Sequence, residues 1–262
     1  MAKKALVVDN DFFFVEFLTE LLENKGYEVV KAYDGKEGIS KLDETFFDVL
    51  FADLIMPKID GKQLIKFARR NLPDLNLLII AVSSTLIEQR DEVSGFDADY
   101  CVVKGPIAQM KKIFNGLLDN LEIYGLQGPV CDIVAPGKLY PRQATSELLE
   151  GMKFQKAIFD SIGIGVLVVG RDARVVSANA MALEFLNKPL EDVLNIRITA
   201  VFHLEGRARL VQALKEVSKN LDLRKRTLHL ICGFEEIRLV VSVLRVGRDL
   251  DGWVLAMEDI NP

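Results

Sequence analysis

Residues 47–61 read FDVLFADLIMPKIDG, and they contain the clearest strand pattern in the first half of the chain. Its apolar run, Val49–Ala52, is continuous rather than alternating, which is typical of a strand buried on both faces of a parallel sheet. Asp53 follows the run directly, and the loop after it leads into a new helical pattern. The stretch therefore predicts a buried strand that ends in a carboxylate and continues through a loop into a helix.

The same unit recurs on both sides of this stretch. Four further short runs, mostly apolar, alternate with segments of helical spacing: Ala5–Val8, Glu28–Ala32, Leu77–Val82 and Tyr100–Val103. Among the helical segments, Phe13, Phe17 and Leu21 recur at four-residue spacing, and a last helix is predicted at Ile107–Ile123. Because strand and helix repeat five times, we expect a doubly wound, flavodoxin-like α/β fold with a five-stranded parallel sheet over residues 1–124.

Residues 125–144 interrupt this alternation with six glycines and prolines, which predicts a linker. A connecting helix is expected at 145–161, with Leu149, Met152 and Phe159 on an apolar face. Two interpretations stay open for this face: it pairs with its copy in a second chain, or it packs onto its own domain.

Residues 162–262 predict a second domain of a different class. A strand hairpin is followed by short helical stretches, a longer helix at Arg207–Val217 and three closing strands. This order is typical of an α+β domain with an antiparallel sheet.

The charge distribution argues against direct nucleic-acid binding. The net charge is −5, and residues 1–124 carry 15 Lys and Arg against 21 Asp and Glu, while the rest carry 18 against 17. Neither part has the dense basic surface of a nucleic-acid binder. The tight basic cluster Arg224–Arg226 is interpreted as the solvated approach to a hairpin.

Apolar runs and cysteines predict a cytoplasmic protein without a membrane segment. The longest uncharged run, Leu75–Ile87, has 13 residues, whereas a membrane helix needs about 20. The apolar run at Ala5–Val8 is too short for a secretory signal. Three cysteines without CxxC spacing (Cys101, Cys131 and Cys232) predict a reducing compartment and no disulfide framework.

Four polar residues fall at the predicted carboxyl ends of strands: Asp9, Asp53, Ser83 and Lys104. Ligands of open α/β sheets bind at this edge. Two neighbouring carboxylates can hold Mg²⁺, and an ammonium and a hydroxyl supply donors to phosphoryl oxygens. A carboxylate can also accept a phosphoryl group as a nucleophile, and Asp53 is the best-placed candidate.

These residues resemble the receiver domain of two-component response regulators. The matching motifs are Leu6–Asp11, Phe47–Pro57 with Asp60-Gly61, Ile80–Ser84 and Val102–Lys104. The resemblance implies that Asp53 accepts a phosphoryl group from a histidine kinase or phosphotransfer protein, with Ser83 as the switch hydroxyl and Lys104 as the phosphate-binding ammonium. It implies Mg²⁺ held by Asp9, Asn10, Asp53 and the Ile55 carbonyl. It also implies no enzyme activity besides the chain's own phosphorylation and dephosphorylation.

Three departures from the receiver pattern bear on function. Asn10 stands where the family has a second acid, so we expect a weak Mg²⁺ site that Asp11 compensates only in part. Cys101 takes the place of the switch aromatic, with Tyr100 on the opposite strand face. Gly105 separates Lys104 from the following proline. These departures support an alternative, a receiver-like interaction scaffold with weak or no phosphorylation.

Hydrolysis of the phosphorylated form depends on the side chains that flank the attacking water. Two residues past the acceptor stands Ile55, and two past the switch hydroxyl stands Thr85. Neither side chain holds a water well, which predicts a long-lived phosphoryl group.

Residues 154–262 resemble a PAS domain through Gly165–Val169, Val175–Asn179 and Trp253–Ile260. The resemblance implies a sensory or dimerisation role and a homodimer through residues 145–161 and the PAS domain. We expect no flavin, because an Asn-Cys-Arg motif is missing, and no haem, because His203 and His229 are poorly placed. Asn179 is expected to bond the backbone at a strand-to-helix corner, and Cys232 to lie in the core.

Overall fold

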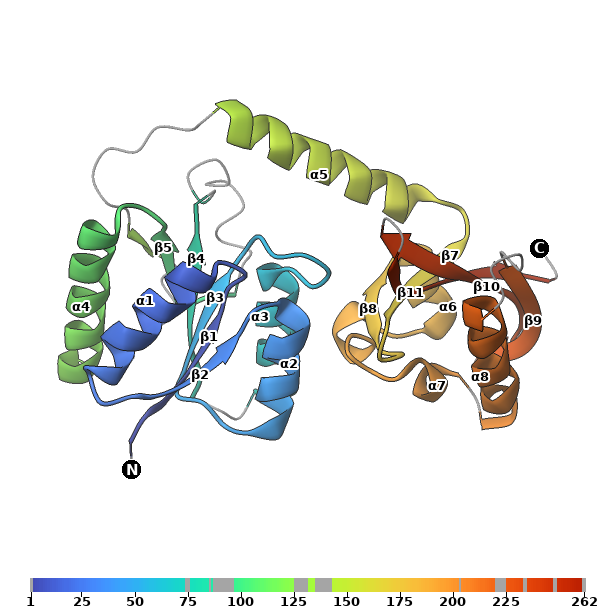
Figure 1. Cartoon of the computed structure of the whole chain (residues 1–262), viewed down its shortest axis with the longest axis horizontal. Helices are drawn as coiled ribbons and strands as arrows, with labels where there is room; N and C mark the ends of the chain where they lie inside the picture. The colour runs from blue at the N-terminus through green and yellow to red at the C-terminus, as the bar shows by residue number, and fades with distance from the viewer. Residues whose placement is uncertain are drawn as a thin grey trace. The chain divides into compact units, whose positions relative to one another are not determined.

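The computed structural model describes residues 2–73, 76–84, 86, 97–124, 132–134, 143–202, 204–219, 225–232, 235–246 and 249–260. The chain divides into two compact units, Met1–Glu150 and Gly151–Pro262, and each contains a sheet with helices packed on it (Figure 1). We call them the first and the second unit.

The first unit has a six-stranded parallel sheet in the order β2-β1-β3-β4-β5-β6. Its strands are β1 (Lys4–Val8), β2 (Glu28–Ala32), β3 (Val49–Asp53), β4 (Leu78–Ser83), β5 (Tyr100–Val103) and β6 (Asp132–Val134). The parallel α/β sheet is confirmed, but it has one strand more than the five predicted. The extra strand, β6, lies in the predicted linker, and its three residues are too few to stand out among the surrounding glycines and prolines.

Helices cover both faces of this sheet. They are α1 (Phe12–Glu23), α2 (Gly35–Glu44), α3 (Gly61–Asn71) and α4 (Ile107–Tyr124). In Figure 1, α1 and α4 lie on one face and α2 and α3 on the other. All residues of β3 and β4 are buried, as the continuous apolar runs predicted.

The predicted apolar face of α1 is wrong at Phe13. The helix starts after Asp11, whose side chain caps it by accepting hydrogen bonds from the backbone N–H groups of Phe13 and Phe14. With this start, Phe13 points to solvent and is 80% exposed. The predicted Leu21 is buried, and the other buried apolar positions are Val15, Leu18 and Leu22. Four-residue spacing did not fix the rotation of the helix about its axis.

The second unit has a five-stranded antiparallel sheet in the order β8-β7-β11-β10-β9. Its strands are β7 (Gly165–Gly170), β8 (Val175–Ala178), β9 (Lys225–Cys232), β10 (Glu235–Val246) and β11 (Asp249–Asp259). Its helices are α6 (Ala180–Leu186), the 3₁₀ turn Leu190–Asp192, α7 (Ile198–Val201) and α8 (Leu204–Lys219). Side chains from the helices and the sheet form one apolar core, so the predicted α+β class with an antiparallel sheet is confirmed.

Helix α5 (Gln143–Ser161) runs into the second unit, and residues 150–158 are all exposed. Within the described part of the chain, no helix combines the length and apolar character needed to cross a membrane.

One cysteine departs from the predicted reducing compartment without a disulfide framework. Cys101 in β5 is disulfide-bonded, and Cys131 lies outside the described residues. Cys232 is in the core, as predicted, with Sγ 3.3 Å from the Phe185 carbonyl oxygen. Sequence spacing alone does not show whether a cysteine forms a disulfide bond.

Candidate functional site

The four predicted site residues lie at one edge of the first unit's sheet. Asp9 directly follows β1, Asp53 ends β3, Ser83 ends β4 and Lys104 directly follows β5. The strand register brings these ends level, because Asp53 pairs with Val82 and the Lys104 N–H donates to the Ser83 carbonyl oxygen at 3.0 Å. The prediction that these residues meet at the carboxyl edge is therefore consistent with the register.

Lys104 forms ion pairs with both carboxylates. Its Nζ lies 2.6 Å from Oδ2 of Asp9 and 3.1 Å from Oδ2 of Asp53. Asp9 is 1% exposed and Asp53 is 6% exposed. Two buried carboxylates thus share one ammonium, which leaves a net negative charge at the edge of the sheet when both are ionised.

Burial dominates the acidity of this pair. It raises the pKa of Asp53 from 3.8 to about 6, while the Lys104 charge opposes the rise and the Asp9 charge adds to it. Burial also raises the pKa of Asp9, again against the effect of Lys104. At neutral pH Asp53 is therefore mostly ionised, although burial raises the free energy of the ionised form. A cation that binds to the carboxylate, or an electrophile that reacts with it, would offset this cost.

The donor chemistry of the site fits a hard divalent cation. Buried carboxylate oxygens with excess negative charge are ligands that Mg²⁺ prefers. The capacity of these carboxylate oxygens to bind a metal is limited, because they already accept hydrogen bonds. Asp9 Oδ1 accepts the Asp11 N–H at 2.9 Å, and Asp53 Oδ1 accepts the Ile55 N–H at 3.4 Å. Asn10 is exposed, and among the described residues no group of three His, Cys, Asp or Glu side chains has metal-site geometry.

Asp11 lies near Asp9, where its charge adds to the rise in the pKa of that carboxyl group, but its own carboxylate has a structural task. Its carboxylate caps α1, at 3.0 Å from the Phe13 nitrogen. Asp11 can therefore replace the charge that is missing at Asn10 only in competition with its role as the helix cap.

The loop after Asp53 is held by close backbone packing. A Cβ at Gly61 would lie 2.0 Å from the Asp53 carbonyl oxygen, and one at Gly35 would lie 2.2 Å from the Ile59 carbonyl oxygen. Asp60 and Gln63 form a reciprocal capping box at the start of α3. These contacts fix the backbone on which Asp53 sits and explain the glycine after Asp60.

Phe14 is a site neighbour that the sequence reasoning missed. The Lys104 Nζ lies 4.7 Å from the centroid of the Phe14 ring, and Phe14 is half-buried. The sequence carried a usable signal in the acid cap at Asp11, because the cap fixes where α1 begins and hence which phenylalanine faces the site.

In the second unit, Asn179 has the structural role that was predicted. It is fully buried, and its Oδ1 accepts the N–H groups of Val166 at 2.7 Å and Ala182 at 2.9 Å. Its Nδ2 donates to the carbonyl oxygens of Phe159 at 3.1 Å and Ile164 at 2.9 Å. The side chain thereby joins the end of α5, the start of β7 and the first turn of α6.

His229, for which the sequence predicts no haem-ligand role, lies exposed on β9. Its Nδ1 is 3.9 Å from Glu236 Oε1. His203 lies outside the described residues.

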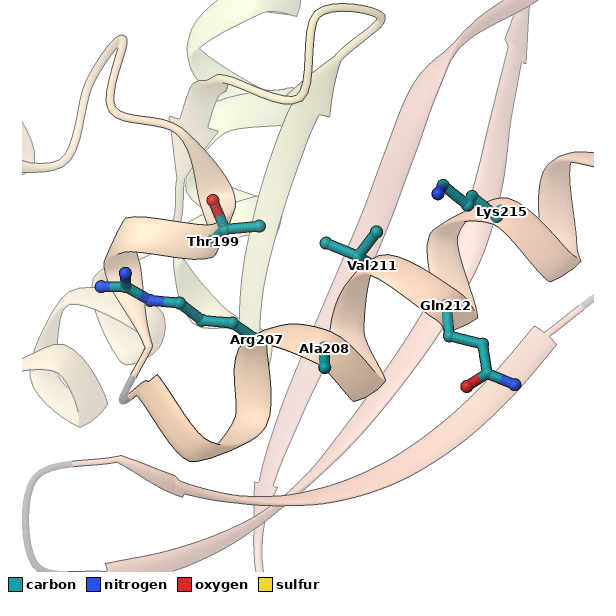
Figure 2. Close-up of a pocket in the computed structure, with 6 residues that line it drawn as sticks. All are labelled: Thr199, Arg207, Ala208, Val211, Gln212 and Lys215. Atoms are coloured by element: carbon teal, nitrogen blue, oxygen red, sulfur yellow. The ribbon is translucent and has the colours of Figure 1, made fainter.

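A groove of about 600 Å³ runs along the solvent side of α8 in the second unit (Figure 2). Its lining residues are Thr199, Arg207, Ala208, Val211, Gln212 and Lys215. Ala208, Gln212 and Lys215 are exposed, so the groove belongs to the surface and not to the core.

The expected absence of haem and flavin stays a prediction.

Comparisons with known proteins agree with the geometry of the first unit. Residues 5–114 match the sequence model of the response regulator receiver domain. The chain is 33% identical over 103 residues to the response regulator ArlR of Staphylococcus saprophyticus, covering 38% of this chain and 45% of ArlR. It is 29% identical over 202 residues to the CpxR homolog of Haemophilus influenzae, a transcriptional regulatory protein, covering 71% and 82%.

Solved structures similar to the chain include the chemotaxis response regulator CheY4 of Vibrio cholerae, with 26% identity, a TM-score of 0.40 and coverage of 45% of this chain and 99% of CheY4. Another is the response regulator TrrA of Thermotoga maritima in complex with Mg²⁺ and BeF, with 30% identity, a TM-score of 0.38 and coverage of 44% and 98%.

The chain spans less than half the length of ArlR. Its homologues are two-component response regulators, and residues 5–114 form a response regulator receiver domain.

Proposed function

We propose that the chain is a phosphorelay response regulator in which Asp53 accepts a phosphoryl group from a histidine kinase or phosphotransfer protein. The observation that carries this proposal is the Lys104 ammonium between the buried carboxylates of Asp9 and Asp53. This arrangement puts a nucleophile and a phosphate-binding cation side by side at the ligand-binding edge of a parallel sheet.

In the proposed transfer, an oxygen of Asp53 attacks phosphorus, the bond from phosphorus to the donor histidine nitrogen breaks, and the nitrogen keeps the electron pair. Lys104 lies close enough to Asp53 to bind an oxygen of the incoming group, and the buried Ser83 supplies a hydroxyl at the end of the neighbouring strand. Asp9, Asp53, Asn10 and the Ile55 carbonyl would hold Mg²⁺, which neutralises charge on the phosphoryl oxygens. The chain would catalyse no reaction besides its own phosphorylation and dephosphorylation.

We also propose that the second unit is a PAS domain that relays the signal. Its five-stranded antiparallel sheet in the order β8-β7-β11-β10-β9, with helices packed on it, supports this proposal. So does Asn179, which lies in a motif of the resemblance and caps α6.

The proposed homodimer uses α5 and the second unit. On α5, Met152 is 49% exposed, Phe154 is 68% exposed and Ile158 is 48% exposed, an amount of exposed apolar surface that a second copy would cover. Phe159 is half-buried, and the side chain of Leu149 lies outside the described residues. Light scattering of the full chain should give a dimer, and Ile158→Glu should shift it toward monomer. Gln155→Glu on the same exposed helix is the control and should leave the dimer intact; a monomeric wild type would contradict the proposal.

Two further parts of the proposal concern location and partners. We place the protein in the cytoplasm, where its kinase would phosphorylate it. The receiver domain supports this placement, whereas the disulfide bond of Cys101 argues against the reducing compartment that the cysteine spacing predicts. We expect no direct contact with nucleic acid, and the ion pair of Arg226 with Glu216 at 3.0 Å, which offsets part of the basic cluster 224–226, supports this expectation.

The alternative function is an interaction scaffold that is phosphorylated weakly or not at all. The exposed, neutral Asn10 and the use of Asp11 as a helix cap favour it. Incubation with acetyl phosphate and Mg²⁺, followed by intact mass measurement, separates the two functions. The response regulator gains one phosphoryl group per chain and Asp53→Asn gains none, whereas the scaffold gains none in either form.

A further inference from the structure

We propose that Phe14 is a positioning residue that holds the Lys104 ammonium between Asp9 and Asp53. The inference rests on the proposed function, in which Lys104 binds the phosphoryl group. The Lys104 Nζ lies 4.7 Å from the centroid of the Phe14 ring, inside the range of about 6 Å over which a ring face attracts a cation. With the two carboxylates at 2.6 Å and 3.1 Å, the ring supplies a third contact for the ammonium.

The Phe14 ring is itself anchored in the core of the first unit. Its centroid lies 6.4 Å from that of Phe114 on α4, and the Phe114 ring lies 5.8 Å from that of Phe51 on β3, both edge-on. Phe114 is 0% exposed and Phe51 is 1% exposed. A chain of three rings therefore connects the ammonium to the centre of the same strand that carries Asp53 at its end.

Lys104 needs such a contact because of its own geometry. The ammonium sits on a flexible four-carbon stem, and the side chain is 17% exposed, so a path to solvent is open. The attraction of the Phe14 ring face for the cation favours rotamers that keep the charge between the carboxylates. When the ring is removed, the ammonium spends more time in water, and fewer molecules have Lys104 where the phosphoryl oxygens arrive.

The test compares Phe14→Leu, which keeps an apolar side chain but removes the ring, with Phe14→Tyr, which keeps the ring face. Phe13→Leu is the matched control, because Phe13 lies on the same helix and is 80% exposed. Two readouts are taken: the initial rate of phosphorylation by acetyl phosphate with Mg²⁺, and the ¹H–¹⁵N signal of the Lys104 ammonium, which is sharp only when the group is held and exchanges slowly with water.

Phe14→Leu should slow phosphorylation by about 5- to 30-fold and broaden the Lys104 signal, while Phe14→Tyr and Phe13→Leu remain within about twofold of wild type. A Lys104 signal that is equally sharp in Phe14→Leu overturns the inference, as does an unchanged phosphorylation rate. If the wild type is not phosphorylated at all, the proposed function fails, and the ammonium signal still decides whether Phe14 holds Lys104.

Discussion

The Lys104 ammonium lies 3.1 Å from Oδ2 of Asp53 and opposes the rise that burial causes in the pKa of that carboxyl group. The same ammonium is 2.6 Å from Asp9, so one cation serves two buried anions. Removing one partner of a buried ion pair costs more than the pair contributes, because the remaining charge stays buried without compensation.

Replacing Lys104 by methionine should therefore destabilise the chain, since Asp9 and Asp53 would both be left without their cation. We expect the free energy of unfolding of the first unit to fall by about 3 kcal/mol at pH 7.5, measured by urea denaturation without divalent metal. Lys111→Met, at an exposed position on α4, is the control and should change it by less than about 0.5 kcal/mol. Equal effects of the two substitutions would contradict the account of the ion pairs.

The pH dependence of stability tests the Asp53 carboxyl group. Its pKa is about 6 in the folded chain against 3.8 unfolded, so the folded state binds the proton more tightly. Between pH 4 and pH 6 the Asp53 contribution to stability therefore declines as the pH rises, and above pH 6 the full cost is present.

Asp53→Asn removes this cost. In the presence of EDTA it should raise the free energy of unfolding by up to roughly 3 kcal/mol at pH 7.5, and the gain should fade toward pH 4. The measurement is urea denaturation of both forms across that range. A substitution that is equally stabilising at pH 4 and pH 7.5 would show that the buried charge is not the cause.

Much of the site could be predicted because continuous apolar runs mark buried parallel strands, and parallel strands end at one edge. Asp9, Asp53, Ser83 and Lys104 follow from that rule alone. Phe14 could not be placed, because four-residue spacing does not fix the rotation of α1, and Phe13 proved to be exposed. The strand β6 could not be predicted for another reason: it has three residues, which are too few to show a hydrophobic period.

In the second unit, features set by neighbouring residues could be predicted from the sequence, whereas a contact between distant residues could not. The strand hairpin and the cap at Asn179 are local patterns, and both were predicted. The contact of Asn179 with the Phe159 carbonyl joins residues 20 positions apart, and no spacing in the sequence indicates it.

Asn179→Asp tests this junction. The substitution keeps the oxygen that accepts from Val166 and Ala182, but it turns the donor to Phe159 and Ile164 into an acceptor that faces two carbonyl oxygens. We expect a loss of about 3 kcal/mol in the free energy of unfolding of the second unit. The exposed Asn187→Asp should cost less than about 1 kcal/mol. Similar losses in both variants would argue against the junction.

Ile55 governs the predicted lifetime of the phosphorylated chain. It is half-buried two residues past Asp53, and its side chain has no group that could hold a water. Thr85, the other flanking residue, lies outside the described residues. Ile55→Asn should shorten the lifetime by roughly 10- to 100-fold, because positioning of the water supplies most of the catalysis. Decay is followed by intact mass in excess Mg²⁺, with Ile55→Val as the control; loss of the phosphoryl group from wild type within seconds would refute the prediction.

Chemical trapping can show whether Asp53 itself carries the phosphoryl group. Borohydride reduces an aspartyl phosphate to homoserine and releases phosphate, so the modified position can be read by peptide mass spectrometry. After treatment with acetyl phosphate and Mg²⁺, we predict homoserine at position 53 of the wild-type chain and at no other aspartate, Asp9 and Asp11 included. Homoserine at another position, or none at position 53 under conditions that phosphorylate a receiver used as a positive control, would contradict the account.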